Sequence, residues 1–467
     1  MIKQSVKQSL KKIFDLAGDG LVARMACVFM LVNLIFAHTG GDNADSRFAM
    51  MMGMVANNTF AIDGYQQMTG DWSQTPDGKY YSNKPPGPAI FAYPIAWAID
   101  RLAVNPAESP SQLIKTREQL ASKTLQVSSW FLQVIPTVLV GFFMDRFMRR
   151  RKFSWNARSY AIVAYFFGTT ASMLQNSFFG HGMAAWSLFA CALFALESRI
   201  AMSGAFFGVA LLADYGSAMA LPGLFYIWYR TEGGVFEKLK FLALGAAIPG
   251  VIWIWYHTAC FGSPFTTSHK FLNPVWVDIP DEQNALWGIF RSVPKFDIAM
   301  KLLFGHERGI LFTQPWVLLA LLVAAFSYGK ITEKFDFTHG FLPLLFTSSI
   351  ALWLANAAFN GWHGGGTVGP RYLSVAFFCM PLLGAMVWDV ASDRIRRLLL
   401  VTLGVGVVYF GFIFTQSILG DMNPWLQQYD RFMTRSAGMK FKVALGFLIV
   451  CGSSYWCIFK SENAAST

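Results

Sequence analysis

The sequence predicts an all-α, polytopic membrane protein, because long apolar segments dominate it and short polar segments separate them. Hydrophobic residues make up 54% of the 467 residues and charged residues only 14%, which is too apolar for a soluble globular chain. A helix needs roughly 20 apolar residues to cross a bilayer, and the apolar runs predict about 11 to 13 transmembrane helices by that length. They form a single domain over residues 21–460, so any chemistry comes from its loops and helix ends.

Basic residues account for the net charge of +11, and they gather beside the ends of apolar runs. Examples are "RFMRRRKFSWNAR" and "DRIRR". This pattern is typical of loops kept in the cytoplasm, so residues 1–20 are expected to be cytoplasmic and the protein to lie in a bacterial inner membrane. The first apolar run has no small-residue cleavage pattern and is interpreted as an anchor. No basic groove interleaved with aromatic residues indicates nucleic-acid binding.

Three polar segments rich in glycine and proline are predicted to be external loops. They cover residues 39–84, 259–308 and 359–372, and counting crossings places them on the same, periplasmic face. Irregular backbone near the membrane persists where protein buries it or where it lines a wet cavity. Residues 86–104 either cross the membrane or form a re-entrant segment, and the second alternative keeps "RFMRRRK" cytoplasmic. The tail, 461–467, is expected to be disordered.

The stretch "GGDNADSRFAM" follows the first apolar run and carries two acids and an arginine. Asp42 and Asp45 could simply solvate the loop or cap a helix that begins near Arg47. Alternatively, one of the two acids is a general base toward an acceptor hydroxyl or amine. Arg47 would then orient that base or hold an anion.

The rest of the first loop combines acids, aromatic rings and one restrained lysine. Asp63 and Asp71 lie beside aromatic residues, a combination that suits a sugar but also an interfacial belt. Lys84 lies between Tyr81 and the proline pair of "DGKYYSNKPPGPAIFAYP", residues 77–94. Proline fixes φ and restricts the residue before it, so the ammonium is positioned. Lys84 is either a snorkelling anchor or a ligand of phosphate.

Four later residues complete the candidate site. In "HGGGTVGPRY" the glycines let backbone amides approach an anion, and Arg371 can bind phosphate in a bidentate manner. His181 and His363 have no metal-ligand spacing, so no metal site is predicted, although a divalent cation could bridge acids and phosphate. Asp214 lies within an apolar run and is expected to have a lysine or arginine partner from the outer face.

The order of these motifs resembles that of bacterial GT-C integral membrane glycosyltransferases, which are distant relatives of protein O-mannosyltransferases and of lipid A aminoarabinose transferases. The resemblance covers residues 20 to 380 and depends on these motifs: "DSRFA", "ID", "DGKYYSNKPPGPAIFAYP", "FFGHGMAAW", "LLADYG", "CFGSPF", "FGHERGILFTQP" and "WHGGGTVGPRYL".

The resemblance implies external transfer of a sugar from a polyprenyl-phosphate carrier to a lipid A, glycolipid, glycan or protein acceptor. It places the base on Asp45 or Asp42 and the donor phosphate on Lys84 and Arg371. The family often has Asp-Glu where this chain has Ala44 and Asp45, which leaves the choice of base open. Asp214 stands where the family commonly has Glu.

Residue chemistry leads to the same scheme, in which cations stabilise the departing phosphate, an acid removes the acceptor proton and the anomeric carbon inverts. Asp63, Asp71, Tyr81, His181, Asp214 and His363 are expected to line the substrate site. Two alternatives are a flippase or transporter of lipid-linked sugars, which would favour inverted repeats, and an O-antigen ligase-like enzyme. The chain shows no internal repeat.

Overall fold

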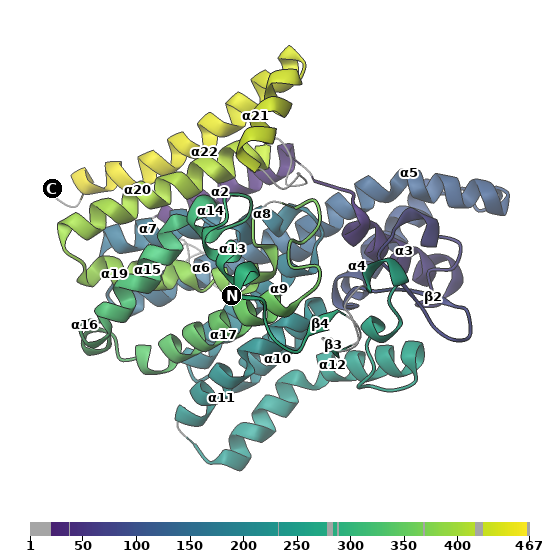
Figure 1. The fold of residues 1–467 in the computed structure, drawn as a ribbon, viewed down its shortest axis with the longest axis horizontal. Helices are drawn as coiled ribbons and strands as arrows, with labels where there is room; N and C mark the ends of the chain where they lie inside the picture. Colours follow the sequence, from purple (N-terminus) through teal and green to yellow (C-terminus); the bar gives the residue numbers. More distant parts are fainter. Residues whose placement is uncertain are drawn as a thin grey trace, which may run out of the picture.

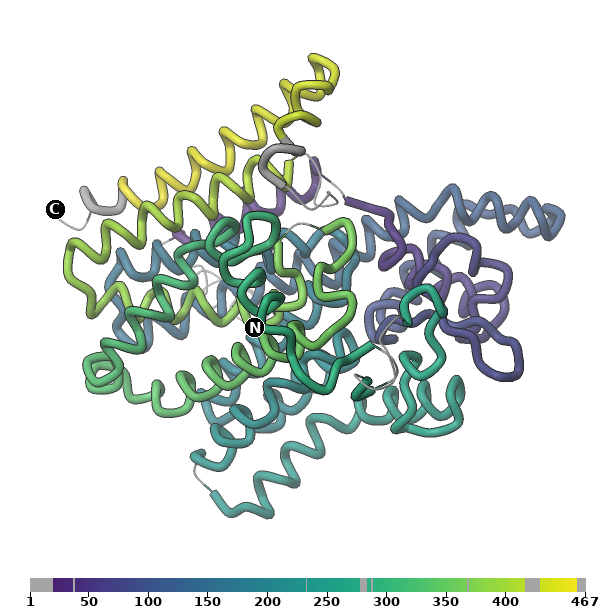
Figure 2. Tube along the Cα trace, viewed as in Figure 1, coloured from purple at the N-terminus to yellow at the C-terminus, as the bar shows by residue number. Residues whose placement is uncertain are grey.

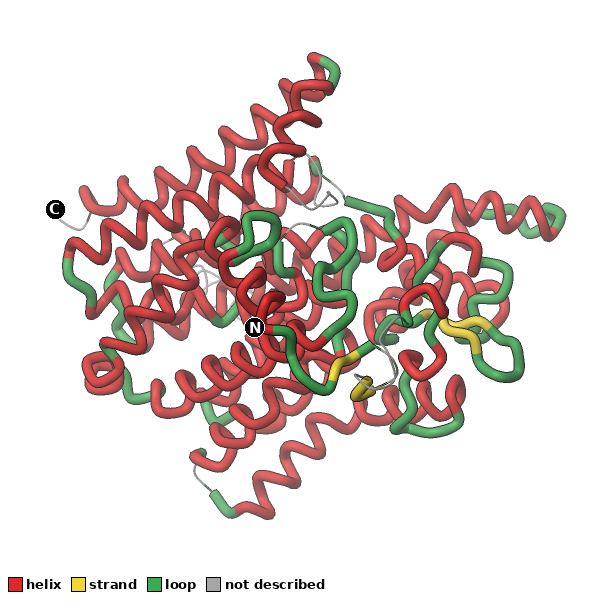
Figure 3. The backbone as a smooth tube through the Cα atoms, viewed as in Figure 1, coloured by secondary structure: helices red, strands yellow, loops and turns green. Residues whose placement is uncertain are grey.

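The computed structural model shows an almost entirely helical molecule with two short β-hairpins (Figures 1 and 3). The structure describes residues 20–36, 38–231, 233–277, 284–286, 289–367, 369–415 and 424–464. The predicted cytoplasmic segment 1–20 therefore lies outside the described residues except for Gly20. The all-α class is confirmed within the described ranges.

Five helices are long and apolar enough to cross a membrane, and the number rises to seven if each of two bent helix pairs is one span. Three further apolar helices, α2 (Leu21–Ile35), α9 (Gly180–Leu196) and α10 (Ile200–Ala213), are shorter. The described residues therefore form a polytopic membrane fold. The number of long helices is below the expected 11 to 13, because several apolar runs are divided into short helices. The long helices and bent pairs are Pro110–Arg150, Val235–Phe261, Thr338–Ala358, Asp393–Phe414, Ala437–Phe459, Pro315–Lys334 and Arg371–Val390.

Helix α9 lies at the centre of the bundle and is buried from Gly180 to Ala195. It packs against α10 on one side and against α6 (Ile135–Arg150) and α18 (Ser374–Phe377) on others. Apart from His181, its residues are small or apolar over the whole circumference, as expected for a helix surrounded by protein. Helices α2, α20 (Asp393–Tyr409) and α22 (Ala437–Ala464) lie along one side of the bundle (Figure 2).

The apolar run around Asp214 is interrupted by a 3-10 segment, η4 (Tyr215–Ala220), between α10 and α11 (Leu221–Arg230). The carboxylate of Asp214 accepts a hydrogen bond from Gly216 N at 2.8 Å, which caps this segment. Two short helices therefore meet at a polar turn, the arrangement that a re-entrant or broken span would need. Helix α4 (Gly87–Ala103) is likewise short, with 17 residues and an internal proline, Pro94.

The first predicted loop contains helix α3 (Asp42–Asn57) and the hairpin β1 (Trp72–Gln74) and β2 (Tyr80–Ser82). Helix α22 (Ala437–Ala464) includes residues 461–464 of the predicted tail, and residues 465–467 lie outside the described residues. The remaining elements are η1 (Gln66–Met68), α5 (Pro110–Ser129), the π-helical turn η2 (Trp130–Val134), α7 (Trp155–Phe167), α8 (Thr170–Met173), η3 (Leu174–Asn176), α12 (Val235–Phe261), η5 (Ser268–Phe271), η6 (Pro274–Trp276), β3 (Asn284–Leu286), β4 (Phe290–Arg291), α13 (Phe296–Phe304), α14 (Ile310–Thr313), α15 (Pro315–Phe326), α16 (Tyr328–Lys334), α17 (Thr338–Ala358), η8 (Arg371–Leu373), α19 (Met380–Val390), α20 (Asp393–Tyr409), the π-helical turn η9 (Phe410–Phe414) and α21 (Pro424–Thr434).

Candidate functional site

The three predicted loops contact one another. Ser73 Oγ donates to Ser268 O at 2.8 Å, and Ser268 Oγ donates to Asn83 O at 3.0 Å, which joins the first loop to the second. Asn360 N donates to Ile289 O at 2.8 Å and joins the third loop to the second. The two serine bonds connect residues that are 195 and 185 positions apart, so the backbone beside Lys84 is held by distant residues.

Asp71 and Lys84 form an ion pair with 2.9 Å between Oδ2 and Nζ. The hairpin positions both residues, because Asn83 N donates to Asp71 O at 3.2 Å. Ser46 Oγ of α3 donates to the same carbonyl at 2.6 Å. Burial would raise the pKa of Asp71, but the charge of Lys84 and its hydrogen bond outweigh that effect and lower the pKa. Lys84 is therefore a positioned cation, as its sequence context predicts, but one that already has an acidic partner.

Asp214 pairs with His181 through the Nδ1 atom of the imidazole. The expected lysine or arginine partner is replaced by a histidine, because the start of α9 faces the turn that follows α10 and brings this ring against the carboxylate. The edge of the His181 ring faces Tyr372, with 5.2 Å between ring centroids. An imidazole held by a carboxylate at one nitrogen has a fixed orientation and tautomer.

Arg47 is buried with only 2% of its surface exposed, and its Nη1 donates to Asn43 O at 2.8 Å. Its Nε has no hydrogen-bond partner. Burial lowers the pKa of Arg47 to about 10, although the negative charges of Asp214 and Asp71 act to raise it and the charge of Arg371 lowers it further. Within the described ranges no acid forms an ion pair with Arg47, since Asp71 and Asp214 are held by Lys84 and His181.

Arg371 is the electrostatic neighbour of most of these groups. Its charge acts on Arg47, Asp71 and His181. Its Nη2 donates to Tyr372 Oη at 2.9 Å, its Nε is buried without a partner, and it too has no ion pair with any described acid. Two guanidinium groups that repel each other are thus held near two acids that already have partners. We call Arg47, Asp71, Lys84, His181, Asp214 and Arg371 the loop-side cluster.

Asp42 and Asp45 lie in the first turn of α3, where the helix dipole favours negative charge. Asp45 and Arg47 are two positions apart, which at 3.6 residues per turn places them on opposite sides of the helix. Asp45 lines an open cavity of about 500 Å³ with Glu118 and Gln67. Burial, with a smaller contribution from the charge of Asp42, raises the pKa of Asp45 to about 6. Asp42 instead accepts a hydrogen bond from Gly70 N at 2.6 Å.

Three other predicted site residues stabilise loop structure. Asp63 is exposed, and its carboxylate accepts from Tyr80 N at 3.0 Å in the hairpin. Tyr81 is buried against Phe261, with 5.5 Å between ring centroids, and burial raises its pKa to about 12. His363 Nδ1 accepts from Gly365 N at 3.0 Å within the third loop.

Sequence reasoning did not single out Arg308, which is buried and donates through Nη2 to Gly365 O at 2.6 Å and through Nη1 to Thr367 O. It shapes the turn before Arg371, and the signal was its position in "FGHERG", a loop motif with a cation. Gly180 was also missed. A Cβ atom there would lie 2.6 Å from Arg47 Nη2 and 2.1 Å from Ala213 O. No pattern within one segment could have indicated that contact.

Among the residues that the structure describes, no group of three or more His, Cys, Asp or Glu side chains is placed to hold a metal ion. The loop-side cluster has cations where a metal would need acidic ligands. Its spare donors are N–H groups, which bind the oxygen atoms of an anion.

No protein-family model and no curated protein matches the chain. Two solved structures, both of ArnT from Cupriavidus metallidurans, are similar to it. The crystal structure bound to undecaprenyl phosphate has 15% identity and a TM-score of 0.47, with 96% of this chain and 78% of that chain covered. The structure in the apo state has 14% identity and a TM-score of 0.46, with 94% and 75% covered.

Proposed function

We propose that the protein is a membrane glycosyltransferase that moves a sugar from a polyprenyl-phosphate donor to an acceptor on the external, periplasmic side. The observation that carries the proposal is a pair of guanidinium groups, the buried Arg47 and the half-buried Arg371, each with a buried Nε that has no hydrogen-bond partner and neither with an acidic ion-pair partner in the described ranges. Bringing two like charges together in a buried place is unfavourable unless an anion joins them. The phosphate of a lipid-linked sugar carries the complementary charge and accepts several N–H bonds at once.

The chemistry that follows is a single displacement. The acceptor oxygen or nitrogen forms a bond to the anomeric carbon while the bond from that carbon to the phosphate oxygen breaks, and the phosphate leaves with the electron pair. Arg47 and Arg371 stabilise the negative charge that grows on the leaving phosphate. The ammonium of Lys84, which Asp71 holds in position, is proposed to face the same phosphate.

Asp45 is the proposed base, because its pKa of about 6 lies near neutral pH and its carboxylate opens onto a cavity wide enough for an acceptor. Asp42 is engaged by Gly70 N, so its proposed role is to fix the loop and raise the pKa of its neighbour. The acceptor proton passes to the Asp45 carboxylate. Attack from the side opposite the phosphate inverts the anomeric carbon. Asp214 and His181, as a fixed pair, are proposed to bind sugar hydroxyls.

The test is turnover of a radiolabelled polyprenyl-phosphate sugar pool by purified protein in membrane extract, with transfer of label to an acceptor as the readout. Arg371→Ala and Asp45→Asn should each reduce turnover by about 10² to 10³, the usual effect of removing one charge-stabilising or proton-transfer group. Asp77→Asn is the matched control for the acid, because Asp77 is an exposed carboxylate of the hairpin turn that contacts Lys79 and Thr75. It should retain most of the activity.

A flippase would give a different result. If the donor is bound or translocated with its glycosidic bond intact, and Asp45→Asn behaves as the wild type, the protein is not a transferase. Arg371→Ala would still weaken donor binding in that case, since both functions need the phosphate site.

A further inference from the structure

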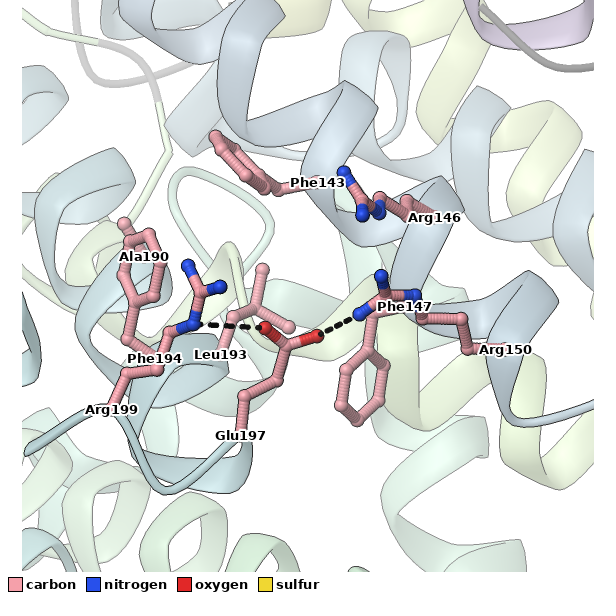
Figure 4. A pocket seen from close by; sticks show the side chains of 9 residues that line it. All are labelled: Phe143, Arg146, Phe147, Arg150, Ala190, Leu193, Phe194, Glu197 and Arg199. Carbon is pink, nitrogen blue, oxygen red and sulfur yellow. Dashed lines mark hydrogen bonds and ion pairs between the residues drawn. The ribbon is translucent and has the colours of Figure 1, made fainter. Parts of the chain in front are cut away.

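A second cluster of charged side chains lies at the other end of helix α9. Arg146 and Arg150 are near the end of α6, Glu197 follows the end of α9, and Arg199 precedes α10 (Figure 4). Arg150, Glu197 and Arg199 line two cavities at once, a small one that Arg146 and Phe194 also line and an open one that Arg151 also lines. We call these five charged residues and Phe194 the basic pocket. The open cavity has a volume of about 320 Å³ and the small cavity beside Arg146 one of about 50 Å³.

The basic pocket has more positive than negative charge. Arg150 Nη1 lies 3.4 Å from Glu197 Oε1 and Arg199 Nε lies 3.9 Å from Glu197 Oε2, so two arginines share one carboxylate. Arg151 pairs with Asp336 at 2.6 Å. Arg146 forms no ion pair with any acid of the described ranges. It precedes Arg150 by one helical turn, so the two positive charges repel each other.

The floor of the basic pocket is apolar. Phe194 packs against Phe143 with 5.7 Å between ring centroids and stacks on Phe206 at 5.4 Å. Phe143 is 42% exposed on the apolar helix that ends at the arginines. The apolar segment of this helix is followed directly by arginines, a pattern that places the pocket at the boundary between lipid and water. Its ligand should therefore combine a negative headgroup with an adjoining hydrocarbon chain.

Distance separates the basic pocket from the loop-side cluster. His181 is at the start of α9 and Glu197 follows its end, which at 1.5 Å per residue puts them about 24 Å apart along the helix. A topology signal requires only basic residues in a loop, in any arrangement. Here arginines from two separate segments surround one cavity and one carboxylate, which is the arrangement of a binding site.

We propose that the basic pocket binds the phosphate of an anionic phospholipid headgroup in the leaflet at this end of α9. The guanidinium of Arg146 supplies the free charge, Arg150 and Arg199 turn from Glu197 toward the phosphate, and the acyl chain lies along Phe143. Basic pockets between membrane helices are suited to such headgroups. Inorganic phosphate shares the headgroup chemistry but lacks the chain.

The experiment measures binding of short-chain phosphatidylglycerol to the full-length protein in neutral detergent, by thermal shift and native mass spectrometry. Phosphatidylcholine and inorganic phosphate serve as comparison ligands. Phosphatidylglycerol should bind the wild type at least tenfold more tightly than either. The double variant Arg146→Gln/Arg199→Gln should bind it roughly 10- to 30-fold more weakly, whereas Glu197→Gln should bind it more tightly because a competing carboxylate is gone.

The matched control is Arg394→Gln/Arg397→Gln, which removes the same charge from exposed arginines at the start of α20, outside the pocket. It should bind like the wild type. An equal loss in both double variants would overturn the proposal in favour of diffuse membrane attraction. Inorganic phosphate that binds as tightly as phosphatidylglycerol would overturn the assignment to a lipid. Tight lipid binding that persists in Arg146→Gln/Arg199→Gln would overturn it as well.

Discussion

The two ends of helix α9 both gather charged residues, but they hold them differently. At the His181 end the charges are buried or half-buried, and two ion pairs join side chains of the first loop, of α9 and of the turn after α10. At the Glu197 end the arginines are largely exposed, and the carboxylate contacts are 3.4 and 3.9 Å long. Burial strengthens electrostatic interactions and fixes side chains, whereas water and salt weaken them. The first end is therefore suited to chemistry at one atom, and the second to attraction of a charged surface.

Among the variants that compare the two ends of α9, the largest effect is expected from Gly180→Ala, which changes no charge. A methyl group there would lie 2.6 Å from Arg47 Nη2 and 2.1 Å from Ala213 O, so the guanidinium or the helix start must move. Displacement of a phosphate-binding group by about 1 Å should lower sugar transfer by about 10²-fold. The readout is transfer of radiolabelled sugar by the purified variant.

The matched control is Gly250→Ala in α12, where a Cβ atom would meet nothing within 4 Å. It should transfer sugar at nearly the wild-type rate. If Gly180→Ala transferred sugar at the wild-type rate, the position of Arg47 would not be critical. The fixed geometry at the His181 end of α9 would then not be needed for transfer.

The contrast between these ends also shows what could be predicted from sequence. The all-α membrane class follows from composition. The proline pair predicted a restrained Lys84, but the ion pair of Lys84 with Asp71 lies beyond what that local pattern indicates. The partner of Asp214 was not predictable, since His181 is 33 positions away and belongs to another helix. The placement of Asp45 and Arg47 on opposite sides of α3 could be predicted only if "DNADSR" was known to be helical. An extended segment would place both side chains on one face. Long-range packing, rather than local pattern, decides the site.

The second prediction concerns the pair of Lys84 and Asp71. Lys84→Ala would leave a nearly buried carboxylate without its cation, and loss of one partner of a buried pair costs up to about 3 to 5 kcal/mol. Because both side chains keep some exposure, we expect a loss of about 2 kcal/mol in the free energy of unfolding. The measurement is thermal unfolding in detergent at low and high salt.

Lys84→Met/Asp71→Asn is the compensating variant and should recover much of the lost stability, since no charge remains unpaired. Thermal stability that is unchanged in Lys84→Ala, together with lost transfer, would identify Lys84 as a ligand of the donor phosphate rather than mainly the partner of Asp71. That result would mean that Lys84, at the His181 end of α9, acts on a ligand rather than serving mainly to neutralise Asp71.

The third prediction uses pH. Asp45 must be ionised to act as a base, and its pKa is raised to about 6. Transfer should therefore be level above pH 6 and fall by about tenfold for each pH unit below it. The folded protein binds the proton more tightly than an unfolded chain with the ordinary value of 3.8, so this group makes stability decrease as pH rises from about 4 to 6.

The measurements are initial transfer rates and thermal unfolding at the same pH values. They separate activity from stability, because the transfer rate should rise with pH over this range while the contribution of Asp45 to stability falls. Glu118→Gln is a useful companion, since it alters the same cavity without removing the proposed base. A rate profile whose fall is centred near pH 4 would assign the proton transfer to a carboxyl group with an ordinary pKa and exclude Asp45.

The smallest effect is expected at the Glu197 end. Arg150→Gln removes an exposed pair, and such pairs contribute about 0.2 to 1 kcal/mol, so unfolding should change by less than 1 kcal/mol and the change should vanish in high salt. Asp145→Asn, in the same helix, is the contrasting variant because its carboxylate is fully buried and lies 2.7 Å from Arg158 Nη2. It should cost several kcal/mol at any salt concentration. If both variants behaved alike, position along the bundle rather than burial would determine how strongly a charge is held, and the comparison of the two ends of α9 would need a different explanation.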